Sequence, residues 1–201
     1  MASPPSLLDP GFRRNWTGLP RRRSAGCTVR SRAAGGAEAG KGRDMANETQ
    51  ATRALAKAGV PFSVHAYDYD PGAERVGLQA AEALGEAPHR VLKTLMALVD
   101  GRPVCAIVAS DAEVAMKKLA AAFGGKAAEM MKPADAERLT GYKVGGISPF
   151  GQKRRVPTAI EEQAMGEDLV YINGGQRGLQ VRLDPKEARR VLDALAVPLI
   201  R

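Results

Sequence analysis

Lys93 is the first residue whose type and setting could support chemistry. It stands in the apolar run Val91–Leu98, where strand alternation places it on one face with Val91 and Leu95. A lysine held in a cleft can bind a phosphate or a polarised carbonyl. The alternative is an edge-strand lysine that protects a sheet from aggregation. The local pattern leaves both interpretations open.

A first glycine loop, residues 140–151, contains the adjacent residues Gly145 and Gly146. Glycine permits positive φ and lets a ligand approach the backbone, and bare N–H groups can hold a phosphate or a developing oxyanion. A bulged connection between strands is the alternative. The loop lacks the ending of a Walker motif. Ser148 precedes Pro149, which is ordinary turn chemistry, and has no obvious histidine partner, so a Ser-His-Asp hydrolase is not expected.

A second glycine loop, residues 173–179, has the sequence Asn-Gly-Gly-Gln-Arg-Gly-Leu. A hairpin turn would explain it alone, but two glycine loops that each carry cations favour ligand binding. No Gly-x-Gly-x-x-Gly opens a helix, so a dinucleotide site is not predicted. The first loop is followed by the basic cluster Lys153, Arg154 and Arg155, which suits phosphate contact or a solvated surface.

The charge of the chain is unevenly distributed. Its 201 residues carry 30 basic and 22 acidic side chains, a net +8, and nine of the basic and three of the acidic ones lie in residues 1–44. That segment therefore holds +6, and the nucleic-acid interpretation of a basic protein is weak for the rest. We expect residues 1–44 to be a disordered basic extension. A misassigned start codon before Met45, an organellar transit peptide and a basic arm for RNA stay open as explanations.

The composition excludes several classes of protein. Two cysteines and two histidines exclude a disulfide framework and a histidine-rich zinc site. Nine aromatic residues are too few for an extended base-stacking surface. No apolar stretch approaches the roughly 18–20 residues that span a bilayer. We expect a soluble protein of a reducing compartment with no membrane contact, metal or cofactor.

Periodicity and turn residues predict the elements that position these groups. We expect helices over residues 48–58, 78–84 and 132–140, another after a capping box at Ser110–Glu113, and a last one from Asp184 that includes Leu195. We expect strands over residues 61–67, 91–99, 103–109, 156–160, 169–172 and 179–183, with a hairpin at Asp100-Gly101. This order favours an α+β class: a single domain, residues 45–201, with a mixed, partly closed, barrel-like sheet flanked by helices.

Three ordered motifs resemble the YbaK/EbsC family. They are Lys93-Thr94-Leu95, Gly145-Gly-Ile-Ser-Pro-Phe-Gly-Gln-Lys153 and Gly174-Gly-Gln-Arg-Gly-Leu179, and the segment Phe62–Asp68 also fits. Members are stand-alone relatives of the editing domain of bacterial prolyl-tRNA synthetases. The likeness runs over about residues 48–200. Many members have serine where this chain has Asn173.

The resemblance implies a set of site residues. Lys93 would orient the ester and the terminal adenosine, and Gly145 and Gly146 would supply backbone donors, as would Gly174 and Gly175. Substrate contacts are implied for Tyr67, Thr94, Ile147, Ser148, Pro149, Asn173, Gly174, Gly175 and Gly178. We expect RNA contacts from Lys153, Arg154, Arg155 and Arg177.

The resemblance also implies a function: a cytoplasmic hydrolase that removes cysteine from mischarged Cys-tRNA(Pro), or from Cys-tRNA(Cys). Such editing is needed because a pocket separates near-isosteric amino acids by only about 1–3 kcal/mol. The nucleophile would be water or the thiol of the substrate. Prolyl-tRNA synthetase is the expected partner. An Ala-tRNA(Pro) deacylase of the same superfamily and a non-catalytic module that binds an aminoacyl nucleotide or a synthetase are the alternatives.

Overall fold

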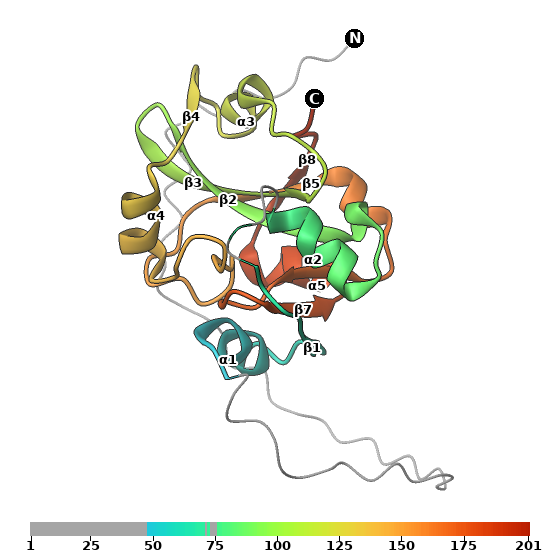
Figure 1. Ribbon diagram of the computed structural model, residues 1–201. Coiled ribbons are helices and arrows are strands. Elements are labelled where there is room, and N and C mark those ends of the chain that lie inside the picture. The colour runs from blue at the N-terminus through green and yellow to red at the C-terminus, as the bar shows by residue number, and fades with distance from the viewer. Residues whose placement is uncertain (1–47, 71, 73–75) are drawn as a thin grey trace, which may run out of the picture. The chain divides into compact units, whose positions relative to one another are not determined.

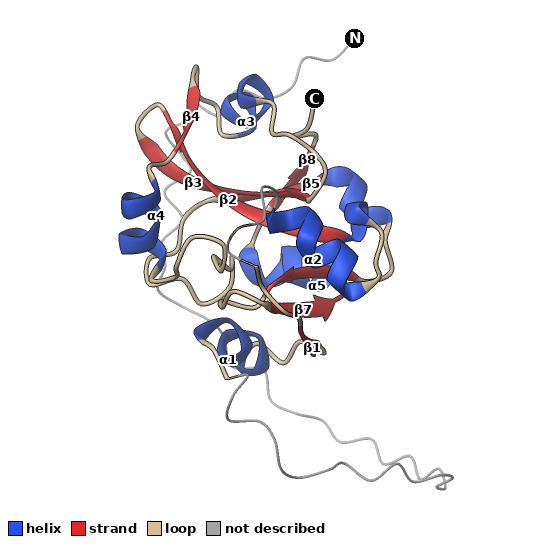
Figure 2. Ribbon diagram, in the orientation of Figure 1, coloured by secondary structure: helices blue, strands red, loops and turns tan. Residues whose placement is uncertain are grey.

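The computed structural model describes residues 48–70, 72 and 76–201, so the expected extension over residues 1–44 lies outside the described residues. One mixed sheet is flanked by helices (Figure 1, Figure 2). Its strands are β1 (Ser63–Ala66), β2 (Val91–Val99), β3 (Arg102–Ala109), β4 (Ala128–Met130), β5 (Thr158–Glu161), β6 (Val170–Asn173), β7 (Leu179–Leu183) and β8 (Leu195–Val197). The helices are α1 (Gln50–Lys57), α2 (Val76–Leu84), α3 (Met116–Ala122), α4 (Pro133–Thr140) and α5 (Pro185–Leu192), with short 3-10 turns at Pro88–Arg90 and Glu162–Gly166.

The strand order is β1-β7-β6-β2-β3-β5-β8, with β4 paired to the far end of β2. Three pairs are parallel, β2 with β6, β3 with β5 and β5 with β8, and the others are antiparallel. The α+β class with a mixed sheet is therefore confirmed. Strands β1 and β8 form the two ends of the order, so the described sheet is not a closed barrel.

The hairpin of β2 and β3 is the longest pairing and was predicted from its turn. Asp100 and Gly101 have φ of 47° and 77°, the left-handed pair that a two-residue turn requires. The Asp100 carboxylate also accepts hydrogen bonds from the N–H groups of Lys126 and Ala127 at 2.9 and 3.0 Å. Asp100 therefore fixes both the hairpin and the approach of β4.

Helix α1 packs against both glycine loops. It begins after Thr49, whose hydroxyl accepts from the Thr52 N–H and donates to the Gly174 carbonyl at 2.5 Å. A side chain at Gly151 would collide with the Gln50 carbonyl, so the close approach of α1 requires glycine there. The capping of this helix thus reaches directly into the second glycine loop.

Three details of the predicted elements were wrong. Ser110 does not open a helix: its hydroxyl donates to the Pro88 carbonyl at 2.9 Å, and α3 begins only after Ala115. A buried tertiary partner was available to Ser110, and it outweighed the local capping pattern. Leu195 lies in β8 rather than in the last helix, and β4 was not predicted. Both are three-residue strands, too short for alternation to reveal.

Alternate residues of β2 enter hydrophobic clusters on opposite sides of the sheet. Leu92 and Met96 belong to the larger cluster, whereas Ala97 and Val99 belong to a second one, and Val91 packs with the α2 residues Ala80 and Ala81. Because side chains alternate along a strand, Lys93 lies on the same face of β2 as Val91 and Ala97. It therefore lies between two apolar clusters on one face of a central strand.

Candidate active site

The middle of β2 has an open side. Val91 and Leu92 pair with β6, and residues 97–99 pair with β4, so no described strand pairs with residues 93–95 on that side. The Val91 carbonyl accepts from the Ser110 N–H next to β3, and alternation then turns the N–H and C=O of Thr94 the other way, toward the gap. A ligand in the gap could therefore meet backbone as well as side chains.

A cavity of about 300 Å³ occupies this gap. It is lined by Tyr67, Ala80, Val91, Leu92, Lys93, Thr94, Leu95, Met96, Ser110, Met130, Met131, Pro133, Ala136, Val144, Gly145, Ile147, Asn173 and Gln180. Among the described residues of this lining, Lys93 is the single charged one, and none of them is an aspartate, glutamate or histidine. The described part of the site thus offers one cation and no side chain of the usual general-base types.

Lys93 is anchored within the cavity. Its Nζ donates to the Ser110 carbonyl at 3.1 Å, and the Ser110 N–H bonds in turn to the Val91 carbonyl at 2.8 Å. β2 lies between β6 and β3 in the strand order, so Lys93 is not on an edge strand of the sheet, although it stands where β2 has an open side. An ammonium fixed at one point can hold a carbonyl oxygen or a ribose oxygen in a defined place.

Asn173 joins the two glycine loops. Its Nδ2 donates to the Gly145 carbonyl at 3.1 Å, and its Oδ1 accepts from the Gly175 N–H at 2.8 Å. The loops also touch through Gly146, because a Cβ there would lie 2.8 Å from the Arg177 backbone nitrogen. The orientation of the first loop therefore depends on the second.

The backbone donors of the loops are not equivalent. The N–H groups of Gly146, Gly174 and Gly175 are engaged, with the Lys143 carbonyl, the Leu179 carbonyl and the Asn173 side chain. In the described part of the chain, the N–H groups of Gly145 and Ile147 make no hydrogen bond. Both residues line the cavity, so these two groups are the ones available to a ligand oxygen.

Two buried side-chain oxygens in the cavity lining lack a partner within the described residues: Thr94 Oγ1 and Gln180 Oε1. A buried acceptor without a partner is costly unless a ligand supplies a donor. Beside them, burial raises the pKa of Tyr67, although a hydrogen bond from Gln180 opposes that shift. Tyr67 therefore remains a neutral hydroxyl near pH 7.

Several expected substrate residues shape the loops without lining the cavity. Ser148 is fully buried, and its hydroxyl accepts from the Phe150 N–H at 3.3 Å. Pro149, Gly174 and Gly175 also lie outside the lining. The Gly178 carbonyl accepts from the Tyr67 N–H at 2.8 Å, and Gly178 has φ of 75°. Gly178 thus holds the backbone of Tyr67, and Gly175 holds the side chain of Asn173.

The expected RNA-contact residues separate into three places. Lys153 and Arg154 line a second cavity of about 430 Å³. Arg155 points elsewhere, since its Nη2 donates to the Val191 carbonyl at 3.3 Å. Arg177 lies against the first cavity, where its Nε donates to the Val144 carbonyl at 2.9 Å.

Sequence reasoning missed Gln180, Ser110 and the methionines of the cavity. Gln180 and Ser110 are polar residues at the end of apolar strands, with 4% and 6% of their surface exposed. A polar residue on a strand signals burial only once its tertiary surroundings are known. Met96, Met130 and Met131 come from two neighbouring segments and give the cavity a soft, polarisable wall.

Metal and thiol chemistry find no support in the described residues. They contain no group of three or more His, Cys, Asp or Glu side chains that could hold a metal ion. Burial raises the pKa of Cys105 to about 12, so its thiol is protonated and acts as a small core residue. None of the described helices is long and apolar enough to cross a bilayer.

Comparison with known protein families identifies the family to which this site belongs. The model of the aminoacyl-tRNA editing domain matches residues 71–191. The chain belongs to the aminoacyl-tRNA editing family. The resemblance drawn from the three motifs is confirmed, and so is the enzyme class, since family members are aminoacyl-tRNA deacylases, ester hydrolases that edit charged tRNA. Helix α1 and strand β1 precede the matched segment, although α1 contacts both loops of the site.

Two relatives bear on this editing-family chain. EbsC of Enterococcus faecalis, whose name assigns it Cys-tRNA(Pro)/Cys-tRNA(Cys) deacylase activity, is 35% identical over 143 residues, which cover 69% of this chain and 85% of EbsC. A proline–tRNA ligase of Maridesulfovibrio salexigens is 37% identical over 100 residues, half of this chain but 17% of the ligase. The similarity to the ligase is therefore confined to one part of that enzyme.

Solved structures support the same fold. A crystal structure described as a trans-editing enzyme for prolyl-tRNA synthetase superimposes with a TM-score of 0.65 at 22% identity, covering 76% of this chain and 95% of the other. A hypothetical protein superimposes with a TM-score of 0.67 at 19% identity and is covered completely. The editing-domain fold thus extends beyond the segment matched by the family model.

Proposed function

We propose that this editing-family protein removes cysteine from Cys-tRNA(Pro), with Cys-tRNA(Cys) as a second substrate. The observation that carries the proposal is the cavity at the open side of β2, whose described lining holds Lys93 beside backbone donors and apolar side chains. An aminoacyl ester is already activated, so its hydrolysis mainly requires positioning and stabilisation of the oxyanion. The catalytic domain is the segment 45–201.

The polar groups of the cavity divide the tasks between them. The Lys93 ammonium, held by the Ser110 carbonyl at 3.1 Å, orients the ester and the ribose of the terminal adenosine. The N–H groups of Gly145 and Ile147 receive the oxyanion that forms on the carbonyl oxygen. Thr94 Oγ1 and Gln180 Oε1, buried and unpartnered in the described structure, accept hydrogen bonds from the α-amino group of the substrate.

The thiol of the substrate can take the place of an enzyme nucleophile. The sulfur attacks the neighbouring carbonyl carbon, a C–S bond forms, and the ester C–O bond breaks as the thiol proton passes to the ribose oxygen. Water then opens the thiolactone to free cysteine. Intramolecular attack gains several kcal/mol from proximity, which suits a cavity whose described lining offers no side chain of the usual general-base types. A water molecule that attacks the ester directly gives the same products.

The cavity walls favour a small, apolar or sulfur-containing side chain. Met96, Met130 and Met131 form much of the wall, and thioether sulfur packs adaptably against such groups. Residues 45–201 carry little net positive charge, so the domain alone binds tRNA weakly. A partner protein must therefore select the tRNA. We assign this selection to prolyl-tRNA synthetase in a cytoplasmic complex, with Lys153, Arg154 and Arg155 contacting RNA phosphates and Arg177 contacting the RNA beside the first cavity.

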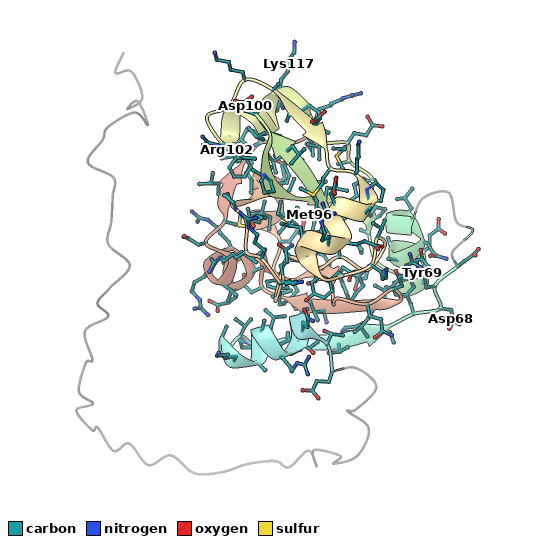
Figure 3. The ribbon with its side chains drawn as sticks, turned by 90° about the vertical axis from the view of Figure 1, so that its left-hand side faces the viewer. Asp68, Tyr69, Met96, Asp100, Arg102 and Lys117 are labelled. Atoms are coloured by element: carbon teal, nitrogen blue, oxygen red, sulfur yellow. The ribbon has the colours of Figure 1, made fainter. Side chains whose placement is uncertain are left out.

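The test compares Cys-tRNA(Pro), Ala-tRNA(Pro) and Ser-tRNA(Pro) as substrates of the full chain and of Lys93→Ala. We expect release of cysteine with little release of alanine or serine, and a loss of at least about 100-fold in Lys93→Ala, the scale of removing one oxyanion-type contact. Lys117→Ala is the matched control, because Lys117 lies on α3, far from Met96 of the cavity (Figure 3).

Other outcomes would redirect the assignment. Preferential release of alanine would establish the Ala-tRNA(Pro) deacylase, and equal release of serine and cysteine would remove the thiol mechanism while leaving water. A folded chain inactive on all three esters would establish a binding module. Equal rates on all cysteinyl-tRNAs, unaffected by added prolyl-tRNA synthetase, would exclude that partner as the source of selectivity.

A further inference from the structure

Tyr69 differs from every other aromatic residue that the structure describes. Six of these seven rings pack in hydrophobic clusters: Phe62, Tyr67, Phe123, Tyr142, Phe150 and Tyr171. Tyr69 belongs to none of them and is only half buried. It follows β1 on the segment that passes the end of the second glycine loop (Figure 3). An aromatic ring that lies outside the core and keeps part of its surface exposed can contact a ligand.

Arg177 and Gly145 place this ring at the mouth of the catalytic cavity. The Arg177 guanidinium carbon lies 5.6 Å from the centroid of the Tyr69 ring, within cation–π range. Arg177 is held by the Val144 carbonyl, and Val144 and Gly145 both line the cavity. A Cβ at Gly145 would lie 3.1 Å from the Tyr69 hydroxyl, and Gly145 has φ of 86°. The ring therefore packs over the same loop backbone that the ester would face.

The charges around Tyr69 favour a neutral ring as its ligand rather than a phosphate. Asp68 and Asp70 flank it in the sequence, and both are exposed. Lys143 lies beyond Val144 and is paired with Glu137 at 2.9 Å. Carboxylates on either side repel a phosphate placed on the ring, whereas a nucleobase is uncharged and stacks on tyrosine and on guanidinium planes.

We propose that Tyr69, backed by Arg177, is a stacking site for a nucleobase at the 3′ end of the RNA, outside the cavity that receives the aminoacyl ester. This inference rests on the proposed function, because the RNA end must enter that cavity. The site would hold the end of the strand in register with Lys93. It supplies binding energy for RNA that the small positive charge of the domain does not.

The first test measures binding without turnover. An uncharged RNA minihelix that ends in CCA is titrated into the full chain, Tyr69→Leu and Tyr69→Phe, and affinity is measured by calorimetry. We expect Tyr69→Leu to weaken binding about tenfold, the scale of losing one stacked base, and Tyr69→Phe to bind as the unaltered protein does. Equal affinity of all three proteins would overturn the proposal, and so would equal weakening in the two variants.

The second test separates this site from the chemistry. The ratio of kcat/KM on Cys-tRNA(Pro) to that on cysteine ethyl ester, which has no base, should fall about tenfold in Tyr69→Leu through KM. A parallel loss on both esters would mean that Tyr69 only supports the loop, and would overturn the stacking site. If the unaltered protein hydrolyses neither ester, the proposed function fails, while the minihelix titration still decides the stacking site.

Discussion

Helix α4 separates two cavities that share Met131 but differ in charge. Toward the first it presents Pro133 and Ala136, and Lys93 is the one charged side chain among the described residues of that lining. Toward the second it presents Asp135, Arg138 and Leu139, which meet Lys153 and Arg154 of the first glycine loop's continuation. The first is enclosed by strands and loops, whereas Arg138 and Asp135 of the second form an exposed ion pair at 2.6 Å.

The difference in charge suggests that the first cavity serves the chemistry and the second serves RNA binding. In apolar surroundings the electrostatic attraction between a single cation and one carbonyl oxygen is strong, because little water is present to screen it. Several exposed cations contribute attraction to a polyanion that falls with salt. Chemistry and RNA affinity should therefore respond to different substitutions and to different conditions.

The largest effect on this division should come from Asn173→Ala. The substitution removes both the bond to the Gly145 carbonyl and the bond from the Gly175 N–H, so the loop donors of the first cavity lose their orientation. We expect kcat to fall about 100-fold on Cys-tRNA(Pro), as for the loss of an oxyanion donor, with KM nearly unchanged. A lower melting temperature with normal kcat for the folded protein would show that Asn173 is only structural.

The second glycine loop, which positions Asn173 of the first cavity, should be sensitive to packing. Gly175→Ala forces a left-handed alanine with φ near 91° and puts a Cβ 2.7 Å from the Tyr142 ring. Gly59→Ala is the matched control, since Gly59 has φ of 67° and nothing within 4 Å of its Cβ position. We expect a loss of about 1 kcal/mol for Gly59→Ala, as left-handed alanine costs, and about 2 kcal/mol more for Gly175→Ala, as overpacking costs. Urea unfolding measures both, and equal losses would contradict a tightly packed second loop.

The second cavity should control salt dependence rather than rate. Replacing Lys153 and Arg154 together by alanine should raise KM about tenfold and leave kcat intact. The slope of log KM against log salt should fall by about 1.4, because each phosphate contact to single-stranded RNA contributes about 0.7. Lys117→Ala serves as control for a lost surface charge. A fall in kcat with an unchanged salt slope would assign the pair to the chemistry instead.

The smallest effect concerns pH at the mouth of the first cavity. The hydrogen bond from Lys143, aided by that from the Val144 N–H, lowers the pKa of Glu137 from 4.5. A lowered pKa means that this carboxylate stabilises the fold above about pH 4.5 and that the contribution is lost as the pH falls through the lowered value. Melting curves from pH 6 to pH 3 should therefore decline more steeply for the unaltered protein than for Glu137→Gln. Parallel declines would show that Glu137 contributes nothing there.

The sequence predicted what local patterns determine. The dipeptide Asp100-Gly101 predicted the hairpin correctly, because few other residue pairs adopt the positive φ angles of such a turn. The helix cap at Asp184, followed by Pro185, likewise appeared where expected. Ser110 misled, because its hydroxyl found the Pro88 carbonyl through the tertiary fold. Lys93 could be marked as a candidate, but only the order of the strands showed that it is central.

The site was predictable in its motifs and not in its hydrogen bonds. Gly145 and Gly146 are adjacent glycines that the sequence cannot tell apart. In the structure the Gly145 N–H makes no hydrogen bond within the described residues, whereas the Gly146 N–H donates to the Lys143 carbonyl. Gln180 lines the cavity because β7 pairs with β6 at Asn173. A hairpin at this loop was one interpretation of the sequence, but the sequence did not show that Gln180 faces the cavity. The family resemblance identified the positions of the site, but only the packing of the folded chain shows which hydrogen-bonding groups at those positions are available to a ligand.

The distant pairing within this site bears on its biosynthesis. The Thr49 hydroxyl binds the Gly174 carbonyl across 125 positions of the chain, and β1 at the start of the domain pairs with β7 near its end. Contacts between such distant segments form late, after both have left the ribosome. A nascent chain therefore has no assembled cavity, and hydrolysis of aminoacyl esters begins only after residues 174–183 have been synthesised.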